Sequence, residues 1–286
     1  MSKIRLAIPN KGRIAEPIND LMNRAGIHVQ IAGARQLIAK TIDPEIEILF
    51  VRPIDIPEYV AKGVADVGIT GLDMVAERRS DVACPLDLKF GSARLVIAVP
   101  EDSPITSVEM MSGTRIATEF PNICKDYFAE RSIPVTIIEV SGACEAAPHL
   151  GIADAIVDLT SSGTTLEVNN LRILGEILAS TTNVIVNKNS LIEKREKIEE
   201  ILLAFESVIA AKNQCYLMLN VQREKLEEIK ALIPGLGGPT IMEIAGSGSV
   251  ALHAVVSTNK VYQLINLLKR AGARDILVLD ITRMVR

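Results

Sequence analysis

Short apolar runs alternate with segments of helical periodicity from the start of the chain to about residue 212. Aliphatic runs bounded by Gly, Pro or polar residues are typical of buried strands, and apolar positions three or four residues apart are typical of helices. The alternation predicts an α/β protein with largely parallel sheets. The strands expected are 4–8, 46–51, 65–70, 95–99, 115–118, 135–140, 155–159, 171–178 and 181–187, and the helices are 13–25, 56–62, 72–78, 122–131, 144–150 and 190–212, the last with Ser190 as its N-cap.

The pattern changes after residue 212. From there the chain predicts a strand, a helix, a hairpin, a second helix and a last strand. This βαββαβ order is that of a ferredoxin-like domain. The segments are 215–222, 223–233, the pair 240–245 and 250–257, 260–271 and 275–282.

An internal similarity lies in the first part of the chain. Gly63-Val-Ala-Asp-Val-Gly-Ile resembles Gly151-Ile-Ala-Asp-Ala-Ile-Val, and each segment passes from a turn glycine into a buried strand and a Gly-containing loop. Four similar residues can arise by chance, but the matched context favours two like-folded lobes. Two α/β lobes commonly bind ligand in the cleft between them, at the carboxyl ends of their strands.

The segment around residue 160 carries the strongest chemical signal. Asp158 ends an apolar strand, and helix-compatible sequence resumes at Leu166. A hydroxyl-rich loop at a helix N-terminus suits a phosphate, and a neighbouring carboxylate suits ribose hydroxyls or a phosphate-bound Mg²⁺. The alternative, an ordinary Ser/Thr cap, accounts for one or two of the hydroxyls. The loop consists of Thr160, Ser161, Ser162, Gly163, Thr164 and Thr165.

Other charged residues follow predicted strands. Lys11 and Arg13 lie in the turn after the first strand, near the positive end of a helix, and Arg52 ends another strand. Cations there suit a pyrophosphate or triphosphate, although a solvated turn is the alternative. Asp73 is either a helix N-cap or a ligand contact. Glu145, at a helix start, either binds ribose hydroxyls or favours the helix dipole.

Composition excludes several kinds of site. The 286 residues predict two or three domains, and the net charge of -4 gives no global attraction to nucleic acid or membrane. Tryptophan is absent, so the chain lacks aromatic platforms on which the bases of single-stranded nucleic acid could stack. The four cysteines form no CxxC pair, which indicates reduced thiols in a cytoplasmic protein. The three histidines are widely separated, which argues against a catalytic triad. Neither a signal peptide nor a membrane-spanning run is expected.

These groups fit a reaction with phosphates on one side and no covalent nucleophile. Glycosyl transfer from a phosphoribosyl donor is such a reaction, with an oxocarbenium-like transition state and a pyrophosphate leaving group. The protein then has to hold the donor phosphate, orient the ribose and neutralise the leaving anion.

A resemblance to a known family rests on the segment from Glu145 to Leu166, Glu-Ala-Ala-Pro-His-Leu-Gly-Ile-Ala-Asp-Ala-Ile-Val-Asp-Leu-Thr-Ser-Ser-Gly-Thr-Thr-Leu. It resembles the signature of the ATP phosphoribosyltransferases, the first enzymes of histidine biosynthesis. Ala-Ile-Pro-Asn-Lys-Gly-Arg13 and the segment from Arg52 to Asp73 also match. The ferredoxin-like domain after residue 212 matches as well. The resemblance therefore covers essentially the whole chain and is to the long form of the family.

The resemblance implies a catalytic core of two lobes, similar to type II periplasmic binding proteins, and a C-terminal ACT-like regulatory domain. We expect lobe I at 1–92 and 180–212, lobe II at 93–179 and the regulatory domain at 213–286. It also implies the substrates ATP and phosphoribosyl pyrophosphate, dependence on Mg²⁺, feedback inhibition by histidine, and a homo-oligomer that is dimeric or hexameric. The rival is a two-lobed small-molecule binding or sensor protein.

Residue roles carried over from the family are expectations too. Glu145, Asp158 and residues 160–165 are expected to bind phosphoribosyl pyrophosphate, with Mg²⁺ held through substrate phosphates and Asp158 as its candidate protein ligand. Lys11, Arg13 and Arg52, acting electrostatically, and Asp73 are expected on ATP. No acid or base is required, because adenine N1 carries a lone pair. Histidine is expected at Asn220, Leu236, Thr240 and Asp275, with Asn220 departing from an Asp of related chains.

Overall fold

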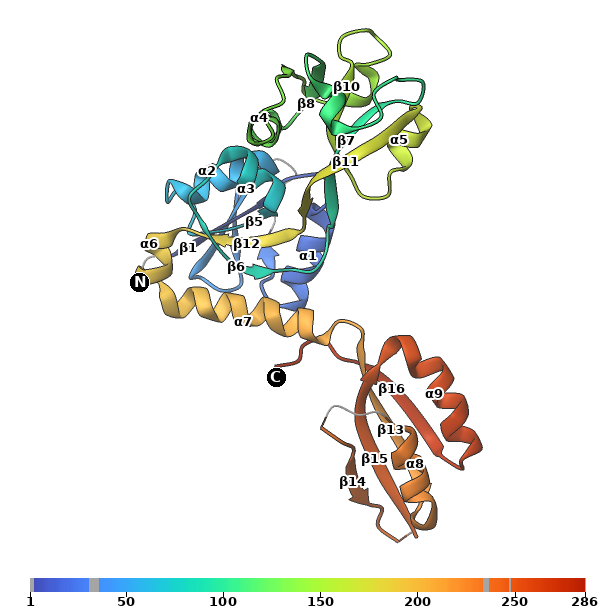
Figure 1. The fold of residues 1–286 in the computed structure, drawn as a ribbon. Coiled ribbons are helices and arrows are strands. Elements are labelled where there is room, and N and C mark those ends of the chain that lie inside the picture. The colour runs from blue at the N-terminus through green and yellow to red at the C-terminus, as the bar shows by residue number, and fades with distance from the viewer. Residues whose placement is uncertain (1–2, 31–35, 234–236, 247, 286) are drawn as a thin grey trace. The chain divides into compact units, whose positions relative to one another are not determined.

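The computed structural model describes residues 3–30, 36–233, 237–246 and 248–285 (Figure 1). It divides into two compact units. The larger comprises Met1–Asn23 and Ile27–Leu202, and the smaller comprises Arg24–Gly26 and Leu203–Arg286. No helix in the described ranges is long and apolar enough to cross a membrane.

The first sheet of the larger unit has seven strands in the order β2-β3-β4-β1-β5-β12-β6. β1 runs parallel to β4 and β5, whereas the other pairs are antiparallel. The strands are β1 (Ile4–Pro9), β2 (Val29–Gln30), β3 (Ile38–Thr41), β4 (Ile46–Val51), β5 (Val67–Gly71), β6 (Ala83–Asp87) and β12 (Thr182–Val186).

The second sheet has five strands in the order β11-β7-β10-β8-β9. β8 runs parallel to β9 and β10, and β7 runs antiparallel to β10 and β11. The strands are β7 (Ala93–Pro100), β8 (Arg115–Thr118), β9 (Thr136–Glu139), β10 (Ala155–Thr160) and β11 (Leu171–Ser180).

The two sheets share one topology. β4-β1-β5-β12-β6 in the first corresponds to β9-β8-β10-β7-β11 in the second. In each, the strand next to the central parallel strands has crossed over from the other sheet and runs antiparallel. The prediction of two like-folded lobes is therefore confirmed. The sheets are mixed rather than largely parallel, because the crossing strands β7 and β12 reverse direction. Below, the first lobe is the seven-stranded sheet with its helices, and the second lobe is the five-stranded sheet with its helices.

Equivalent aspartates account for the internal sequence similarity. The carboxylate of Asp66 accepts a hydrogen bond of 2.9 Å from the N–H of Arg5, at the start of β1. The carboxylate of Asp154 accepts one of 2.8 Å from the N–H of Arg115, at the start of β8. Each aspartate N–H also donates to the carbonyl of its arginine. The repeated motif therefore fixes the same pair of neighbouring strands in each lobe.

Helices connect these strands, except α7, which begins in the larger unit and leads into the smaller one (Figure 1). The segment expected as a helix at 144–150 forms only a short 3-10 turn. The helices are α1 (Ala15–Arg24), α2 (Ile56–Ala61), α3 (Leu72–Arg78), α4 (Pro121–Glu130), α5 (Thr164–Val168), α6 (Lys188–Glu193) and α7 (Arg195–Ala211), with 3-10 turns at η1 (Pro53–Asp55), η2 (Val108–Met111) and η3 (Cys144–Ala146).

Two other expectations were wrong in detail. The long helix expected from Ser190 is two helices, and its N-cap is Asn187, whose side chain accepts hydrogen bonds from the N–H groups of Asn189 and Ser190. The strands β2, β3 and β6 were not expected at all. β6 contains Pro85 and lies at the edge of its sheet, where a missing N–H is tolerated.

The smaller unit confirms the ferredoxin-like prediction. Its antiparallel sheet has the order β14-β15-β13-β16, and the chain order is βαββαβ. Leu217 and Leu252 of the sheet pack in one core with Ile229 and Leu268 of the two helices. The elements are β13 (Gln214–Gln222), η4 (Arg223–Lys225), α8 (Leu226–Leu232), β14 (Thr240–Glu243), β15 (Ser249–Ser257), α9 (Thr258–Arg270) and β16 (Arg274–Asp280).

Candidate functional site

The hydroxyl-rich loop leads from β10 into α5, as the sequence predicts. Inside it, the hydroxyl of Thr160 accepts a hydrogen bond of 2.8 Å from the N–H of Gly163, and the hydroxyls of Ser162 and Thr164 lie 2.7 Å apart. Gly163 has φ +86°, and a Cβ added there meets nothing within 4 Å. Glycine is therefore favoured by the backbone conformation, and the space beside it is open.

The loop presents unused polar groups to solvent. Ser161, Ser162, Thr164 and Thr165 are exposed. Within the described ranges, the N–H groups of Ser161, Ser162 and Thr165 have no hydrogen-bond acceptor. Orphan N–H groups beside exposed hydroxyls can bind the oxygens of a phosphate.

A group of carboxylates lies next to the loop. The pKa of Asp158 is raised to about 6, chiefly by burial and in smaller part by the charges of Glu119 and Glu145, whereas the N–H of Leu159 donates to the Asp158 carboxylate and opposes the shift. Glu119, directly after β8, accepts a hydrogen bond from the N–H of Gly142. The three acids concentrate negative charge at the carboxyl ends of β8 and β10.

These carboxylates do not form a ready metal cage. No group of three or more His, Cys, Asp or Glu residues in the described part of the chain could hold a metal ion by itself. Cys144 is buried beside Glu145, and burial raises the pKa of its thiol to about 12. Cys144 is therefore protonated at neutral pH and unsuited to act as a nucleophile.

A cavity of about 160 Å³ lies where the first lobe meets Leu159 of β10. Its lining includes Arg13, Pro53 and Asp73, which follow the carboxyl ends of β1, β4 and β5. The crossing segments contribute Gly91 and Thr182. The structure thus brings together two first-lobe residues that the sequence nominated, Arg13 and Asp73, beside the strand that carries Asp158.

The cations of the first turn are available to a ligand. Arg13 donates one hydrogen bond of 3.3 Å to the carbonyl of Ser92. Lys11 is exposed and has no hydrogen bond or ion pair within the described ranges. Gly12 between them has φ +102°, which a residue with a Cβ rarely adopts. The turn therefore presents both side chains without committing either to a strong internal partner.

Asp73 and Arg52, in contrast, already have side-chain hydrogen-bond partners within the protein. Asp73 is 3% exposed, and its carboxylate accepts a hydrogen bond of 2.5 Å from the hydroxyl of Ser180. It is not the N-cap of α3, because Gly71 occupies that position. Arg52 is largely exposed, and its Nε donates to Asp55 at 2.7 Å. Arg52 is not among the residues that line the described cavity.

In the smaller unit, Asn220 and Asp275 come together. The side-chain amide of Asn220 donates a hydrogen bond of 2.9 Å to Asp275, and both line a hollow of about 260 Å³. A bulge in the β13–β16 pairing lies next to Asn220, and Asp275 has φ +50°. Thr240 pairs with His253 in β14–β15 and does not line this hollow. Leu236 lies outside the described residues.

Some residues at these sites were missed from the sequence. Glu119 carries a readable signal, because it directly follows a strand of the same layer as Asp158. No such signal exists for Gly91 and Thr182, which line the cavity, or for Ser180, which bonds Asp73 of its lining, because only the crossing of the chain between the lobes brings them there.

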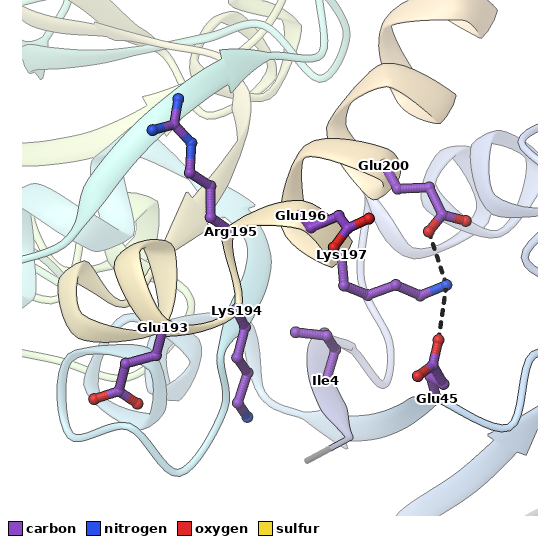
Figure 2. A pocket seen from close by; sticks show the side chains of 8 residues that line it. All are labelled: Ile4, Glu45, Glu193, Lys194, Arg195, Glu196, Lys197 and Glu200. Atoms are coloured by element: carbon purple, nitrogen blue, oxygen red, sulfur yellow. Dashed lines mark hydrogen bonds and ion pairs between the residues drawn. The ribbon is translucent and has the colours of Figure 1, made fainter. Parts of the chain in front are cut away.

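A larger hollow of about 430 Å³ lies beside the first residue of β1 and the start of α7, away from these groups (Figure 2). Lys197 extends between Glu45 and Glu200 there, and it also bonds Asp43. Lys194 bonds the buried carboxylate of Asp66. The lysines in this hollow are thus already paired, which favours a structural role.

Comparison with known proteins agrees with this geometry. The profile of the family described as "ATP phosphoribosyltransferase" matches residues 52–207, and that of "HisG, C-terminal domain" matches residues 211–283. Proteins named ATP phosphoribosyltransferase are similar along their whole length. That of Methanocella arvoryzae is 51% identical over 284 residues, 99% of this chain and 100% of that protein. That of Methanocaldococcus jannaschii is 49% identical over 288 residues, again 99% of this chain and 100% of that protein.

A solved structure is also similar. It is the ATP phosphoribosyl transferase (HisG:HisZ) complex from Thermotoga maritima, with a TM-score of 0.63 and 35% sequence identity. The match covers 71% of this chain and 98% of that chain.

Proposed function

The chain belongs to the ATP phosphoribosyltransferase family, and from that premise we propose how its residues divide the work. It is a transferase that catalyses the first step of histidine biosynthesis. The reaction joins N1 of the adenine of ATP to the anomeric carbon of phosphoribosyl pyrophosphate and releases pyrophosphate. The shared two-lobed topology and the C-terminal ferredoxin-like unit are those of the long form of the family.

The second lobe holds the phosphoribosyl donor. The loop 160–165 binds the phosphate through its hydroxyls and free N–H groups, and Glu145 and Asp158 bind the ribose hydroxyls. The exposed hydroxyls and the open space beside Gly163 support this assignment. The carboxylates also favour the positive charge that develops on the ribose ring in the transition state.

The first lobe holds ATP and the leaving group. Lys11 and Arg13 supply positive charge to the phosphates, Asp73 forms a wall of the cavity, and Arg52 reaches the same edge of the sheet from its ion pair with Asp55. No side chain has to remove a proton, because adenine N1 attacks with its lone pair. Catalysis here consists of alignment and charge stabilisation.

The carboxylates near the loop fit Mg²⁺ that enters with the pyrophosphate. Glu119, Glu145 and Asp158 leave negative charge unneutralised, yet they do not form a cage of their own. Asp158 is the residue that would hold the ion, together with substrate phosphates. When bound, Mg²⁺ neutralises charge on the departing pyrophosphate.

The smaller unit senses histidine at Asn220 and Asp275, with Thr240 and Leu236 completing the site. The hollow lined by Asn220 and Asp275 supports the role of these two residues. Histidine bound there inhibits by favouring a less active global state of a dimeric or hexameric enzyme. The four unpaired cysteines support a cytoplasmic location.

The observation that carries the proposal is the exposed, hydroxyl-rich loop 160–165, which directly follows the strand whose Leu159 lines the cavity of Arg13 and Asp73. The test is to mix the protein with ATP, phosphoribosyl pyrophosphate and Mg²⁺, and to measure pyrophosphate release and the adduct. Omission of the donor is the control. Binding of both substrates without pyrophosphate release would instead support the rival, a binding or sensor protein.

A further inference from the structure

Helix α3 is part of the first lobe, yet it contacts the second lobe. Met74 packs against the core of the second lobe. Asp73 and Glu77, four residues apart and hence on one face of the helix, are 3% and 5% exposed. Buried carboxylates are costly unless hydrogen-bonded, so the partners of Glu77 identify its role.

Glu77 caps a helix of the opposite lobe. Its carboxylate accepts hydrogen bonds from the N–H of Asn122, at 3.0 and 3.1 Å, and from the N–H of Ile123, at 3.1 Å. In return, the side-chain amide of Asn122 donates to the carbonyl of Glu77 at 3.0 Å. Phe120, at the N-cap position of α4, makes no side-chain cap. The first turn of α4 therefore depends on the other lobe for this cap.

The contact between Glu77 and α4 lies close to site residues of both lobes. On the first lobe, Asp73 lines the cavity one helical turn before Glu77. On the second, Glu119 lies two residues before α4 and acts on the pKa of Asp158. A shift of α4 relative to α3 would thus move the donor-side carboxylates relative to the ATP side.

We propose that Glu77 is a positioning residue that sets the separation of the two lobes during phosphoribosyl transfer. The inference rests on the proposed function, which places the donor on one lobe and ATP on the other. Loss of the cap leaves each half-site intact but misaligns them. A small misplacement of reacting atoms has a large effect on rate.

The test compares Glu77→Ala and Glu77→Gln with two controls. Gln retains one acceptor oxygen but places an amide where the second carboxylate oxygen was. Asp126→Asn removes the charge from an exposed ion pair with Arg79 between the same helices. Ile116→Val destabilises the second-lobe core without touching the contact.

Calorimetry should give dissociation constants for ATP alone and for the Mg²⁺–donor complex alone within about twofold of wild type in all variants, because each half-site is intact. By contrast, kcat per folded molecule should fall by at least about tenfold in Glu77→Ala and by less in Glu77→Gln. Both controls should retain kcat. Spin labels at Lys62→Cys and Glu130→Cys, in a Cys84→Ser background diluted with unlabelled protein, should show a broader distance distribution in Glu77→Ala.

Unchanged kcat and unchanged label distances in folded Glu77→Ala would overturn the inference. So would a loss of kcat in Ile116→Val equal to that in Glu77→Ala, because stability alone would then account for it. A wild-type protein that releases no pyrophosphate contradicts the proposed function instead. The label distances report on the role of Glu77 even in that case.

Discussion

Ser180 donates a hydrogen bond of 2.5 Å from its hydroxyl to the carboxylate of Asp73, and accepts one of 3.1 Å from the N–H of the same residue. Ser180 is the last residue of β11, just before the chain crosses to the first lobe, and Asp73 lies in the first turn of α3. Both residues are buried. The pair therefore joins the wall of the cavity to the crossing segment.

Replacement of Ser180 by Ala should destabilise the protein and weaken ATP binding. It leaves a buried carboxylate oxygen without its donor, which costs roughly 1–3 kcal/mol. Denaturant unfolding and calorimetry with ATP measure the two effects. The control is Ser207→Ala, because within the described residues the hydroxyl of Ser207 bonds only a carbonyl of its own helix. ATP affinity unchanged in Ser180→Ala would show that Asp73 does not depend on this bond.

Replacement of Thr165 by Val should raise KM for phosphoribosyl pyrophosphate while the fold survives. A hydroxyl bonded to a charged phosphate is worth roughly 1.5–3 kcal/mol. Thr165 is the sharper choice, because Thr164 also contacts Ser162 and its loss disturbs a second hydroxyl. Thr114→Val, in the same lobe but bonded to the carbonyl of Met111, is the control. Steady-state kinetics identical to wild type would remove Thr165 from the donor site.

The raised pKa of Asp158 predicts two pH dependences. Its pKa of about 6 in the folded protein lies above the ordinary value of 3.8, so the folded state favours the protonated form. The associated stability is present below pH 4 and is lost as the pH rises through 6, by up to about 3 kcal/mol. Asp158→Asn should therefore be more stable than wild type at pH 7 to 8, with the difference gone near pH 4.

The affinity for the phosphoribosyl donor should rise with pH, whereas the stability falls. The ionised carboxylate accepts hydrogen bonds from ribose or binds Mg²⁺, so wild-type affinity for the donor should fall as the pH drops from 7 to 5. Asp158→Asn should bind weakly and show a flatter profile. Calorimetry and urea unfolding at matched pH values measure both trends. A wild-type affinity independent of pH in this range would contradict the ligand role of Asp158.

Arg52→Ala should lower activity without lowering stability. Its ion pair with Asp55 is exposed, and such pairs contribute at most about 1 kcal/mol. Arg78 remains to bond Asp55 in the variant. Thermal unfolding and the specific activity of folded protein decide the question. A large loss of stability with normal activity would assign Arg52 to the structural pair alone.

The sequence predicts features that depend on local residues and on periodicity. The loop 160–165 and the repeat around Asp66 and Asp154 are contiguous, so their backbone roles follow from neighbouring positions. Glu77 could not be assigned in this way, because its partners lie 45 and 46 residues away in the other lobe. The N-cap Asn187 was missed in favour of Ser190, three residues later, because both residue types cap helices and only the backbone distinguishes them.

Asn220→Asp should bind histidine more tightly than wild type. The substitution places a second carboxylate beside Asp275, where Asn220 now donates a hydrogen bond of 2.9 Å. Two adjacent carboxylates repel each other. An ammonium group from histidine relieves this repulsion and gains a charge-assisted bond. Calorimetry measures the affinity for histidine. The matched control is Asn266→Asp on α9, because in the described part of the chain the side chain of Asn266 bonds only Tyr262. Equal or weaker histidine binding in Asn220→Asp would place the ammonium group elsewhere, and no binding to wild type would remove the regulatory role.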